Sequence, residues 1–289
     1  MANKKQTLSA AQKIVIEYYK AKLNLMHVLN ARWAAASAVD LFQKPYSRPR
    51  RKDPPIWKHA KKLKLASGPN KLAGFHWVPE KPTGKKFLIV HGFAGNARSF
   101  EKYIHPMLHR GYDVFAYDAP GHGKSSGSRL NLISYKWALE DIIQHHGHFD
   151  AYMAHSLGGM SLMLALEQLG FQHQNNIVLI APLIEVQRAT VNFGQFLQLP
   201  NVMMAHVTRE IEEKAGHPLA WFSLPRILRQ HKGKVLWVHD RQDYTTPFDD
   251  MTEILAQPPT HIEFLVTEGL GHSRIYRDNQ VRKKVLESL

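Results

Sequence analysis

From Lys85 onward, short continuous apolar segments alternate with stretches of helical pattern, and this alternation constrains the fold more than any other feature of the sequence. Runs rich in Val, Ile, Leu and Phe are typical of strands that are buried on both faces. Strands that alternate with helices along a chain form parallel sheets. The sequence therefore predicts an α/β domain with a mostly parallel sheet. The six predicted strands are FLIVHG, YDVFAYDA, DAYMAHS, NNIVLIAP, KVLWVHD and HIEFLVTEG.

The segment AYMAHSLGGM places Ser156 between one of these strands and a predicted helix at residues 157–170. A serine at such a tight strand-to-helix turn is held in a strained, exposed position, and the turn closes only if its neighbours are small. Gly158 and Gly159 follow the serine, and Ala154 stands where the G-x-S-x-G pattern has its first glycine. The segment predicts a nucleophilic serine; the alternative is a serine that only caps the helix.

A nucleophilic serine needs a histidine base, and the base needs a carboxylate to orient it. On a scaffold of this type the acid and then the histidine follow the serine along the chain. Asp243 lies in the loop after VLWVHD, shortly before Pro247, where a carboxylate can turn towards the base. Asp240 is the alternative acid, but it is closer to the strand end and better placed to form the turn. His272 follows the last predicted strand, in TEGLGHSRI, and is the predicted base.

Acyl transfer also needs N–H donors for the oxyanion that develops on the substrate. In FLIVHGFAGNARSF, His91 and Gly92 end a predicted strand, so that the backbone N–H of Phe93 can point at the substrate. The N–H of Leu157, directly after the serine, is the second predicted donor. The alternative is that HGFAGN within this segment is only a flexible strand-to-helix turn without a role in catalysis.

These segments, together with DAPGHGKSSG at residues 118–127, resemble the α/β-hydrolase family, in particular its esterases and its monoglyceride-lipase-like and serine-aminopeptidase-like members. The resemblance extends over about residues 74–289. It implies a mostly parallel, eight-stranded sheet flanked by helices, with a lid after the sixth strand. It also implies a serine hydrolase of the carboxylesterase or lipase type, without a cofactor or metal. The site residues it implies are Ser156, Asp243 and His272 for catalysis and Phe93 and Leu157 as oxyanion donors.

An insertion interrupts the alternation of strands and helices. Residues 183–233 separate the strands NNIVLIAP and KVLWVHD, far more than a simple crossover needs. The insertion contains aromatic side chains such as Phe193, Phe196 and Trp221, which favours a helical lid. The alternative is a long structural crossover.

Residues 1 to about 70 lie outside the family resemblance. Apolar residues recur at helical spacing over residues 8–42, which predicts one or two helices. Prolines recur over residues 43–55 and predict an extended linker. We therefore expect a helical extension with a Pro- and Arg-rich linker over residues 1–55 and a hydrolase core over residues 56–289. The core is expected to begin with a hairpin formed by KKLKLAS and KLAGFHWVPE.

The positive charge is concentrated in the N-terminal part of the chain. The net charge is +14, and residues 1–86 contain 19 Lys and Arg against 4 Asp and Glu, whereas the rest of the chain is nearly neutral. The excess therefore belongs to the extension, which argues against specific nucleic-acid binding by the core. It allows a peripheral contact of residues 1–55 with an anionic membrane; the alternative is that the segment is an arm that packs within the protein or between copies of it. For the tract RPRRK at residues 48–52, the alternatives are a solvated surface and a tether to acidic patches of the core.

Composition and motifs disfavour several other functions. The chain has no cysteine, which excludes disulfides, thiolate metal sites and a cysteine nucleophile. The HHGH cluster at residues 145–148 has no partner carboxylate at a convincing spacing, and PGHGKSSG lacks the G-x-x-x-x-G-K-[ST] phosphate loop. No apolar stretch suits a signal sequence or a membrane span. We therefore expect a soluble, cytoplasmic protein, peripheral to a membrane if the extension docks there.

Together these features predict a serine hydrolase that cleaves carboxylic esters or thioesters of small molecules through an acyl-enzyme on Ser156. Two alternatives remain. The same triad serves amidases and peptidases, and a non-catalytic binding protein can use the same scaffold.

Overall fold

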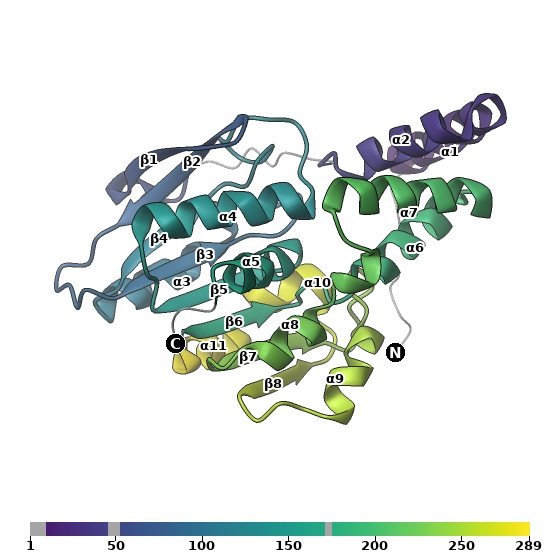
Figure 1. The fold of residues 1–289 in the computed structure, drawn as a ribbon. Coiled ribbons are helices and arrows are strands. Elements are labelled where there is room, and N and C mark those ends of the chain that lie inside the picture. Colours follow the sequence, from purple (N-terminus) through teal and green to yellow (C-terminus); the bar gives the residue numbers. More distant parts are fainter. Residues whose placement is uncertain (1–9, 46–52, 171–174) are drawn as a thin grey trace. The chain divides into compact units, whose positions relative to one another are not determined.

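The computed structural model describes residues 10–45, 53–170 and 175–289 (Figure 1). The basic tract at residues 48–52 lies outside these ranges. The chain divides into two compact units, which are described separately. The helical unit comprises Met1–Gln43 and Glu185–Phe222, and the sheet unit comprises Lys44–Ile184 and Ser223–Leu289.

An eight-stranded sheet forms the centre of the sheet unit, in the order β1-β2-β4-β3-β5-β6-β7-β8. β1 and β2 form the predicted antiparallel hairpin and β2 pairs antiparallel with β4, whereas all other neighbours are parallel. This topology confirms the predicted α/β class. The strands are β1 (Lys61–Ser67), β2 (Asn70–Trp77), β3 (Lys86–Val90), β4 (Asp113–Tyr117), β5 (Ala151–His155), β6 (Asn176–Ile180), β7 (Val235–Asp240) and β8 (Ile262–Thr267).

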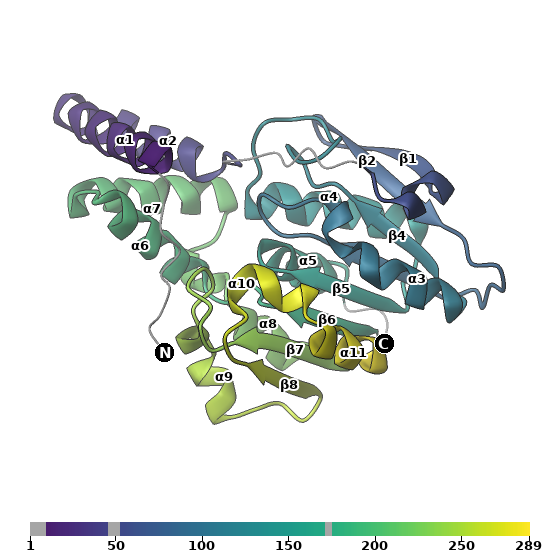
Figure 2. The same ribbon diagram turned by 180° about the vertical axis from the view of Figure 1, so that it is seen from behind.

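Helices cover both faces of this sheet. One face, in front in Figure 1, is covered by α4 (Leu132–His146), α5 (Leu157–Gln168) and α8 (Leu224–Gln230). The other face, in front in Figure 2, is covered by α3 (Glu101–His109) and α11 (Asn279–Ser288). Successive side chains of a strand point to opposite faces, yet Phe87, Leu88 and Ile89 of β3 are each at most 1% exposed. The double cover is the reason that continuous apolar runs mark these strands.

The remaining helices of the sheet unit are short and belong to its connecting segments. They are the α-helices α9 (Thr252–Ala256) and α10 (Gly271–Arg274) and the 3₁₀ helices η1 (Pro55–His59), η2 (Ala97–Phe100), η4 (Phe248–Met251) and η5 (Ile275–Arg277).

The order of the strands indicates where a site should lie. β3 pairs with β4 on one side and with β5 on the other, so that the chain changes direction across the sheet at β3. In open parallel sheets, ligands bind outside the carboxyl ends of the strands at such a switch point. The segments that follow β3 and β5 are therefore expected to contribute to the site.

The helical unit has an apolar core of its own. It contains α1 (Ala10–Leu29), α2 (Ala31–Phe42), α6 (Val186–Leu197), α7 (Asn201–Ala215) and the 3₁₀ helix η3 (Leu219–Trp221). Asn30 separates α1 from α2, and its side-chain oxygen accepts hydrogen bonds from the N–H groups of Arg32 and Trp33. The core residues are Leu23, Ala34, Ala35, Ala38, Val39, Leu197, Leu199, Met203 and Val207. The N-terminal helices thus share a core with the insertion, which the sequence did not indicate.

The predicted division at residue 55 and the lid role of residues 183–233 stay predictions. Of the insertion, α6 and α7 lie in the helical unit, whereas α8 lies in the sheet unit. Within the described ranges, no helix combines the length and apolar character needed to cross a membrane.

Candidate active site

Ser156 lies at the turn between β5 and α5 in a conformation that is rare for residues other than glycine. Its φ is 55° and its ψ is −129°, and such strain costs about 1–3 kcal/mol. A Cβ added to Gly158 would lie 2.4 Å from the carbonyl oxygen of His91, and one added to Gly159 would lie 2.9 Å from a proline side chain. Both positions therefore need glycine. Ala154, in contrast, is a buried residue of β5 itself, where its methyl group is accommodated.

The side chains of Ser156, His272 and Asp243 form one hydrogen-bonded chain. Nε2 of His272 lies 3.0 Å from Oγ of Ser156, and Nδ1 of His272 lies 2.8 Å from Oδ2 of Asp243. Nδ1–H donates to the carboxylate, which leaves Nε2 free to accept the serine proton. Asp243 has a fully buried side chain, whereas that of His272 is 14% exposed. The structure thus brings together the three residues that were predicted as catalytic.

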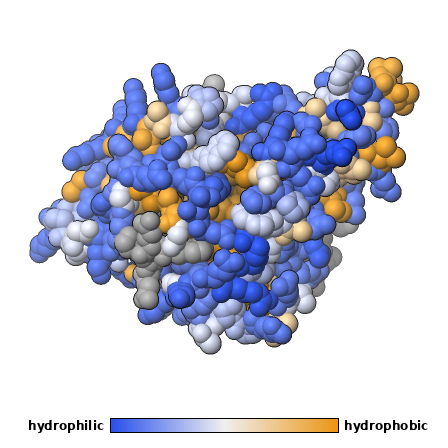
Figure 3. Space-filling view, viewed as in Figure 1, coloured by the Kyte–Doolittle hydropathy of each residue, from blue (hydrophilic) through white to orange (hydrophobic). Residues whose placement is uncertain are grey.

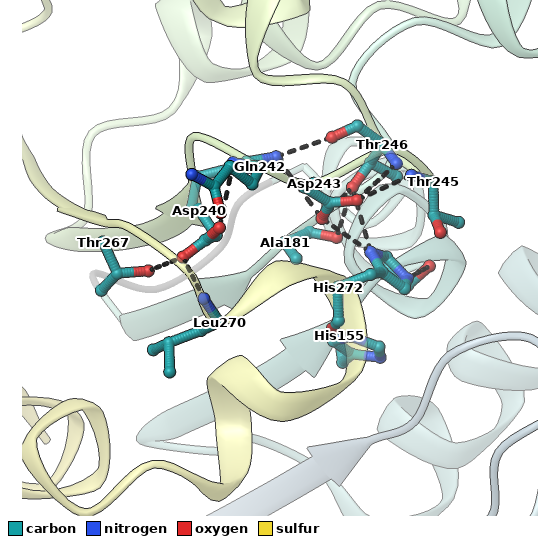
Figure 4. A network of polar contacts seen from close by, with 12 residues as sticks. His155, Ala181, Asp240, Gln242, Asp243, Thr245, Thr246, Thr267, Leu270 and His272 are labelled. Carbon is teal, nitrogen blue, oxygen red and sulfur yellow. Dashed lines mark hydrogen bonds and ion pairs between the residues drawn. The ribbon is translucent and has the colours of Figure 1, made fainter. Parts of the chain in front are cut away.

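The loop after β7 holds the carboxylate of Asp243 in place (Figure 4). Its Oδ1 accepts hydrogen bonds from the backbone N–H groups of Thr245 and Thr246, at 2.8 and 3.0 Å, and its Oδ2 accepts one from the Thr246 hydroxyl at 2.9 Å. Burial alone would raise the pKa of Asp243, but the hydrogen bond and charge interaction with His272 and the N–H of Thr246 lower it below its usual value. The carboxylate is therefore ionised and oriented at neutral pH.

Asp240, the alternative acid, has other partners. It is the last residue of β7 and fully buried, and its carboxylate accepts hydrogen bonds from the N–H groups of Gln242 and Leu270, each at 3.0 Å, and from the Thr267 hydroxyl at 2.7 Å. Burial acts to raise the pKa of Asp240, and these hydrogen bonds outweigh it and lower the pKa. Asp240 therefore ties the end of β7 to the segment that carries the histidine (Figure 4).

The two predicted oxyanion donors are neighbours of the serine. A Cβ added to Gly92 would come within 2.8 Å of the Cβ of Ser156, so that the turn after β3 approaches the serine as closely as glycine permits. Phe93 is the next residue of this turn. Leu157 is the first residue of α5, and the first N–H groups of a helix have no partner within the helix.

Comparison with known proteins identifies the family of this chain. Residues 81–225, half of the chain, match the family model described as serine aminopeptidase, S33. The chain belongs to the α/β-hydrolase family. An esterase of Pyrococcus furiosus shares the fold of this α/β-hydrolase, with a TM-score of 0.64 and 18% identity over 86% of this chain and 96% of that chain. The family that the sequence motifs indicated, the α/β-hydrolases, is therefore confirmed.

Several curated relatives of this α/β-hydrolase are named as lipases or as an esterase. Human monoglyceride lipase is 26% identical over 118 residues, which make up 38% of this chain and 38% of that protein. The match thus spans little more than a third of the length of the lipase. A putative esterase/lipase 2 of Mycoplasma pneumoniae is 24% identical over 235 residues, which make up 68% of this chain and 86% of that protein. The chain is accordingly similar to proteins that are named as esterases and lipases.

Two histidines of this α/β-hydrolase hold the turn that contains Phe93. Nε2 of His122 accepts a hydrogen bond from the N–H of Ala94 at 2.9 Å, and Nε2 of His91 accepts one from the N–H of Ala119 at 2.9 Å. The Nδ1 atom of each ring lies within 2.9 Å of a backbone carbonyl oxygen. Because each Nε2 is an acceptor, both rings are neutral and carry their proton on Nδ1. Burial lowers the pKa of His91, in agreement with its neutral state.

His155, which directly precedes Ser156, contacts His272, the predicted base. Its Nε2 lies 3.1 Å from the carbonyl oxygen of His272, and the centroids of the two rings are 4.7 Å apart. Burial and the neighbouring His272 lower the pKa of His155 to about 3. The ring is therefore neutral and donates Nε2–H to this carbonyl group, which helps to fix the backbone at His272.

The sequence pointed to none of these supporting residues individually. The P-G-H-G pattern in DAPGHGKSSG contains His122 and could have identified it. No local pattern marks His155 or Thr246, because their partners in the site are identified only by the fold.

Within the described ranges of the chain, no group of three or more histidine and acidic side chains is arranged so that it could hold a metal ion. In the HHGH segment, Nε2 of His146 lies 2.7 Å from the hydroxyl of Tyr117, and burial, with nearby positive charge, lowers the pKa of His146 to about 4. This ring is therefore engaged within the fold.

Proposed function

We propose that this α/β-hydrolase cleaves carboxylic esters or thioesters through a covalent acyl-enzyme on Ser156. The observation that carries the proposal is the chain of hydrogen bonds from Ser156 through His272 to Asp243, with the serine at a strained turn. Such a chain of nucleophile, base and orienting acid is the arrangement that activates a serine hydroxyl.

In the proposed first step, Nε2 of His272 takes the hydroxyl proton while Oγ of Ser156 attacks the carbonyl carbon. Asp243 stabilises the imidazolium ion, and the N–H groups of Phe93 and Leu157 stabilise the oxyanion. His272 then passes its proton to the leaving alcohol or thiol, and the acyl group stays on the serine. Water attacks the acyl carbon after giving a proton to His272. The carboxylate product leaves as the serine regains its proton.

The test compares wild type with Ser156→Ala in the hydrolysis of p-nitrophenyl acetate and butyrate. We expect kcat to fall at least about 10³-fold, because the remaining groups cannot supply a nucleophile. Ser128→Ala is the matched control, since this serine is exposed and outside the triad. Undiminished turnover by Ser156→Ala contradicts the proposal.

Trapping separates an acyl-enzyme from direct attack by water. Wild type that is acid-quenched during turnover should show a mass increase of one acyl group. Native wild type should separately react with a fluorophosphonate probe, and Ser156→Ala should show neither result. Wild type that fails to react with the probe would support a non-catalytic binding protein instead. Parallel assays with aminoacyl p-nitroanilides test the amidase or peptidase alternative, because faster cleavage of these amides than of esters would contradict the preference for esters.

We also propose that the insertion acts as a lid that favours hydrophobic acyl groups. The start of α6 and the segment after η3 lie side by side, because the N–H of Val186 donates to the carbonyl oxygen of Phe222 at 3.2 Å. The helices α6 and α7 of the insertion carry apolar side chains, including Phe193, Phe196 and Val202. A series of p-nitrophenyl esters from acetate to octanoate should show rising kcat/KM with chain length. A profile without any preference beyond acetate speaks against the lid proposal.

A further inference from the structure

Helix α1 carries a stripe of exposed apolar side chains along one face. Residues 14, 18, 25 and 29 are separated by 4, 7 and 4 positions, which places them on one side of a helix. The side chains of these four residues are between 59% and 78% exposed. We define the apolar stripe as Ile14, Tyr18, Leu25, Val28 and Leu29 of α1 together with Trp33 of α2, which is 71% exposed. Figure 3 shows apolar side chains, in orange, gathered over these two helices.

The stripe is not the face that α1 uses inside the helical unit. Leu23, on the opposite side of α1, is 1% exposed in the core of this unit, and Ile16 and Met26 pack against the same core. A surface helix of a globular protein needs only one apolar face. Contiguous exposed patches of this kind mark contact sites for other molecules or membranes.

Positive charges surround the stripe. Lys13, Lys22 and Arg32 are exposed on α1 and at the start of α2. Residues 10–45 contain two acidic residues, Glu17 and Asp40, and the carboxylate of Glu17 pairs with Lys20 at 2.9 Å. The occupant of this surface should therefore be apolar at its centre and anionic around it.

We propose that the apolar stripe docks on the surface of an anionic lipid bilayer. The aliphatic side chains enter the boundary between headgroups and acyl chains, Tyr18 and Trp33 lie at headgroup level, and the surrounding cations contact anionic headgroups. A second copy of the chain fits less well, because two stripes that met would bring like charges together. The proposal does not depend on the catalytic role of Ser156.

Sedimentation with vesicles tests the proposal on the full chain. Wild type should bind vesicles of phosphatidylcholine with 30% phosphatidylserine and bind pure phosphatidylcholine more weakly. Leu25→Ser/Leu29→Ser should lower the partition coefficient for the anionic vesicles at least about tenfold. The matched control Val78→Ser/Trp137→Ser removes two exposed apolar side chains of the sheet unit, which are 47% and 56% exposed, and should bind as wild type does.

Two further measurements distinguish a loss of membrane binding from a loss of folding. Circular dichroism and turnover of p-nitrophenyl acetate without vesicles should be the same for wild type and Leu25→Ser/Leu29→Ser, because neither residue belongs to a core or to the catalytic site. If this variant does not fold, brominated lipids should quench the fluorescence of wild type more than that of Trp33→Phe, which locates Trp33 at the membrane.

Three results would overturn the proposal. The first is wild type that does not bind anionic vesicles, and the second is equal binding by the stripe variant. The third is a wild-type dimer, seen by analytical ultracentrifugation, that the stripe substitutions dissociate while binding to vesicles is absent. That third result would assign the stripe to self-association.

Discussion

Replacement of Asp243 by asparagine distinguishes an acid that orients the base from a carboxylate that only stabilises the loop. Oδ1 of Asp243 accepts two backbone N–H groups, from Thr245 and Thr246. The amide oxygen must occupy this place, because an NH₂ group there would face two donors. The NH₂ group then occupies the place of Oδ2, which lies 2.8 Å from Nδ1 of His272. Nδ1 must accept this hydrogen bond, and the ring proton moves to Nε2, 3.0 Å from Oγ of Ser156.

A histidine that already carries its proton on Nε2 cannot take the proton of the serine. In a serine protease triad the same exchange lowers kcat about 10⁴-fold by imposing the wrong tautomer. Because the two N–H donors dictate the orientation of the amide here, we expect the full effect. Asp243→Asn should lower kcat about 10⁴-fold, which corresponds to about 5.4 kcal/mol of activation free energy.

Asp240→Asn is the matched control, and the assay is kcat for p-nitrophenyl butyrate combined with urea unfolding. The amide oxygen can accept from Thr267 and Leu270, which leaves its NH₂ group facing the N–H of Gln242. One unsatisfied buried donor costs about 1–3 kcal/mol of stability, while kcat of the folded variant should change little. If Asp243→Asn keeps kcat within tenfold of wild type, or Asp240→Asn loses more activity than it, the assignment of the acid is refuted.

Three further predictions concern the residues that support the site. Folding lowers the pKa of His155 from 6.5 to about 3, so the stability that the neutral ring contributes is complete above pH 6.5 and is lost as the pH falls towards 3. His155→Gln should therefore flatten the decline of the urea unfolding midpoint between pH 7 and pH 4. An unchanged slope would contradict this prediction. His122→Phe removes the acceptor of the Ala94 N–H and should lower kcat about 10- to 100-fold with little change in KM. His122→Gln should retain more activity, because its amide oxygen can accept this hydrogen bond. Equal rates for both variants would argue against a role of this hydrogen bond in positioning the turn. Gly92→Ala places a Cβ 2.8 Å from that of Ser156, so fluorophosphonate labelling should slow at least about tenfold, and labelling at the wild-type rate would show that the turn can relax.

The sequence predicted the elements whose pattern is local. Continuous apolar runs mark β3, β5, β6 and β7 because helices bury both of their faces, and the glycines after Ser156 mark the turn because a Cβ would meet other parts of the chain. Position after a strand end was enough to select His272 among 18 histidines. These features depend on neighbours along the chain or on a rule that holds for the whole fold class.

The features that the sequence did not reveal depend on contacts between distant segments. Asp240 and Asp243 are three positions apart and both follow the apolar part of β7, and only the pairing of Asp240 with Thr267 of β8 distinguishes them. His155 is a packing residue by its sequence context, and its contact with His272 spans 117 positions. Helical periodicity likewise indicates an apolar face on α1 and on α7, but it does not indicate that the two helices share a core.

The location of the two proposed activities makes them separable. The groups assigned to catalysis follow β3, β5, β7 and β8 and all belong to the sheet unit, whereas every residue of the apolar stripe belongs to the helical unit. Ser156→Ala should therefore abolish turnover without reducing vesicle binding, and Leu25→Ser/Leu29→Ser should reduce vesicle binding without reducing turnover of a water-soluble ester. If the stripe also serves to deliver substrate, its loss should raise KM only for esters presented in anionic vesicles. An equal loss of activity on water-soluble and vesicle-borne esters would instead indicate that the stripe substitutions disturb the fold or the site itself.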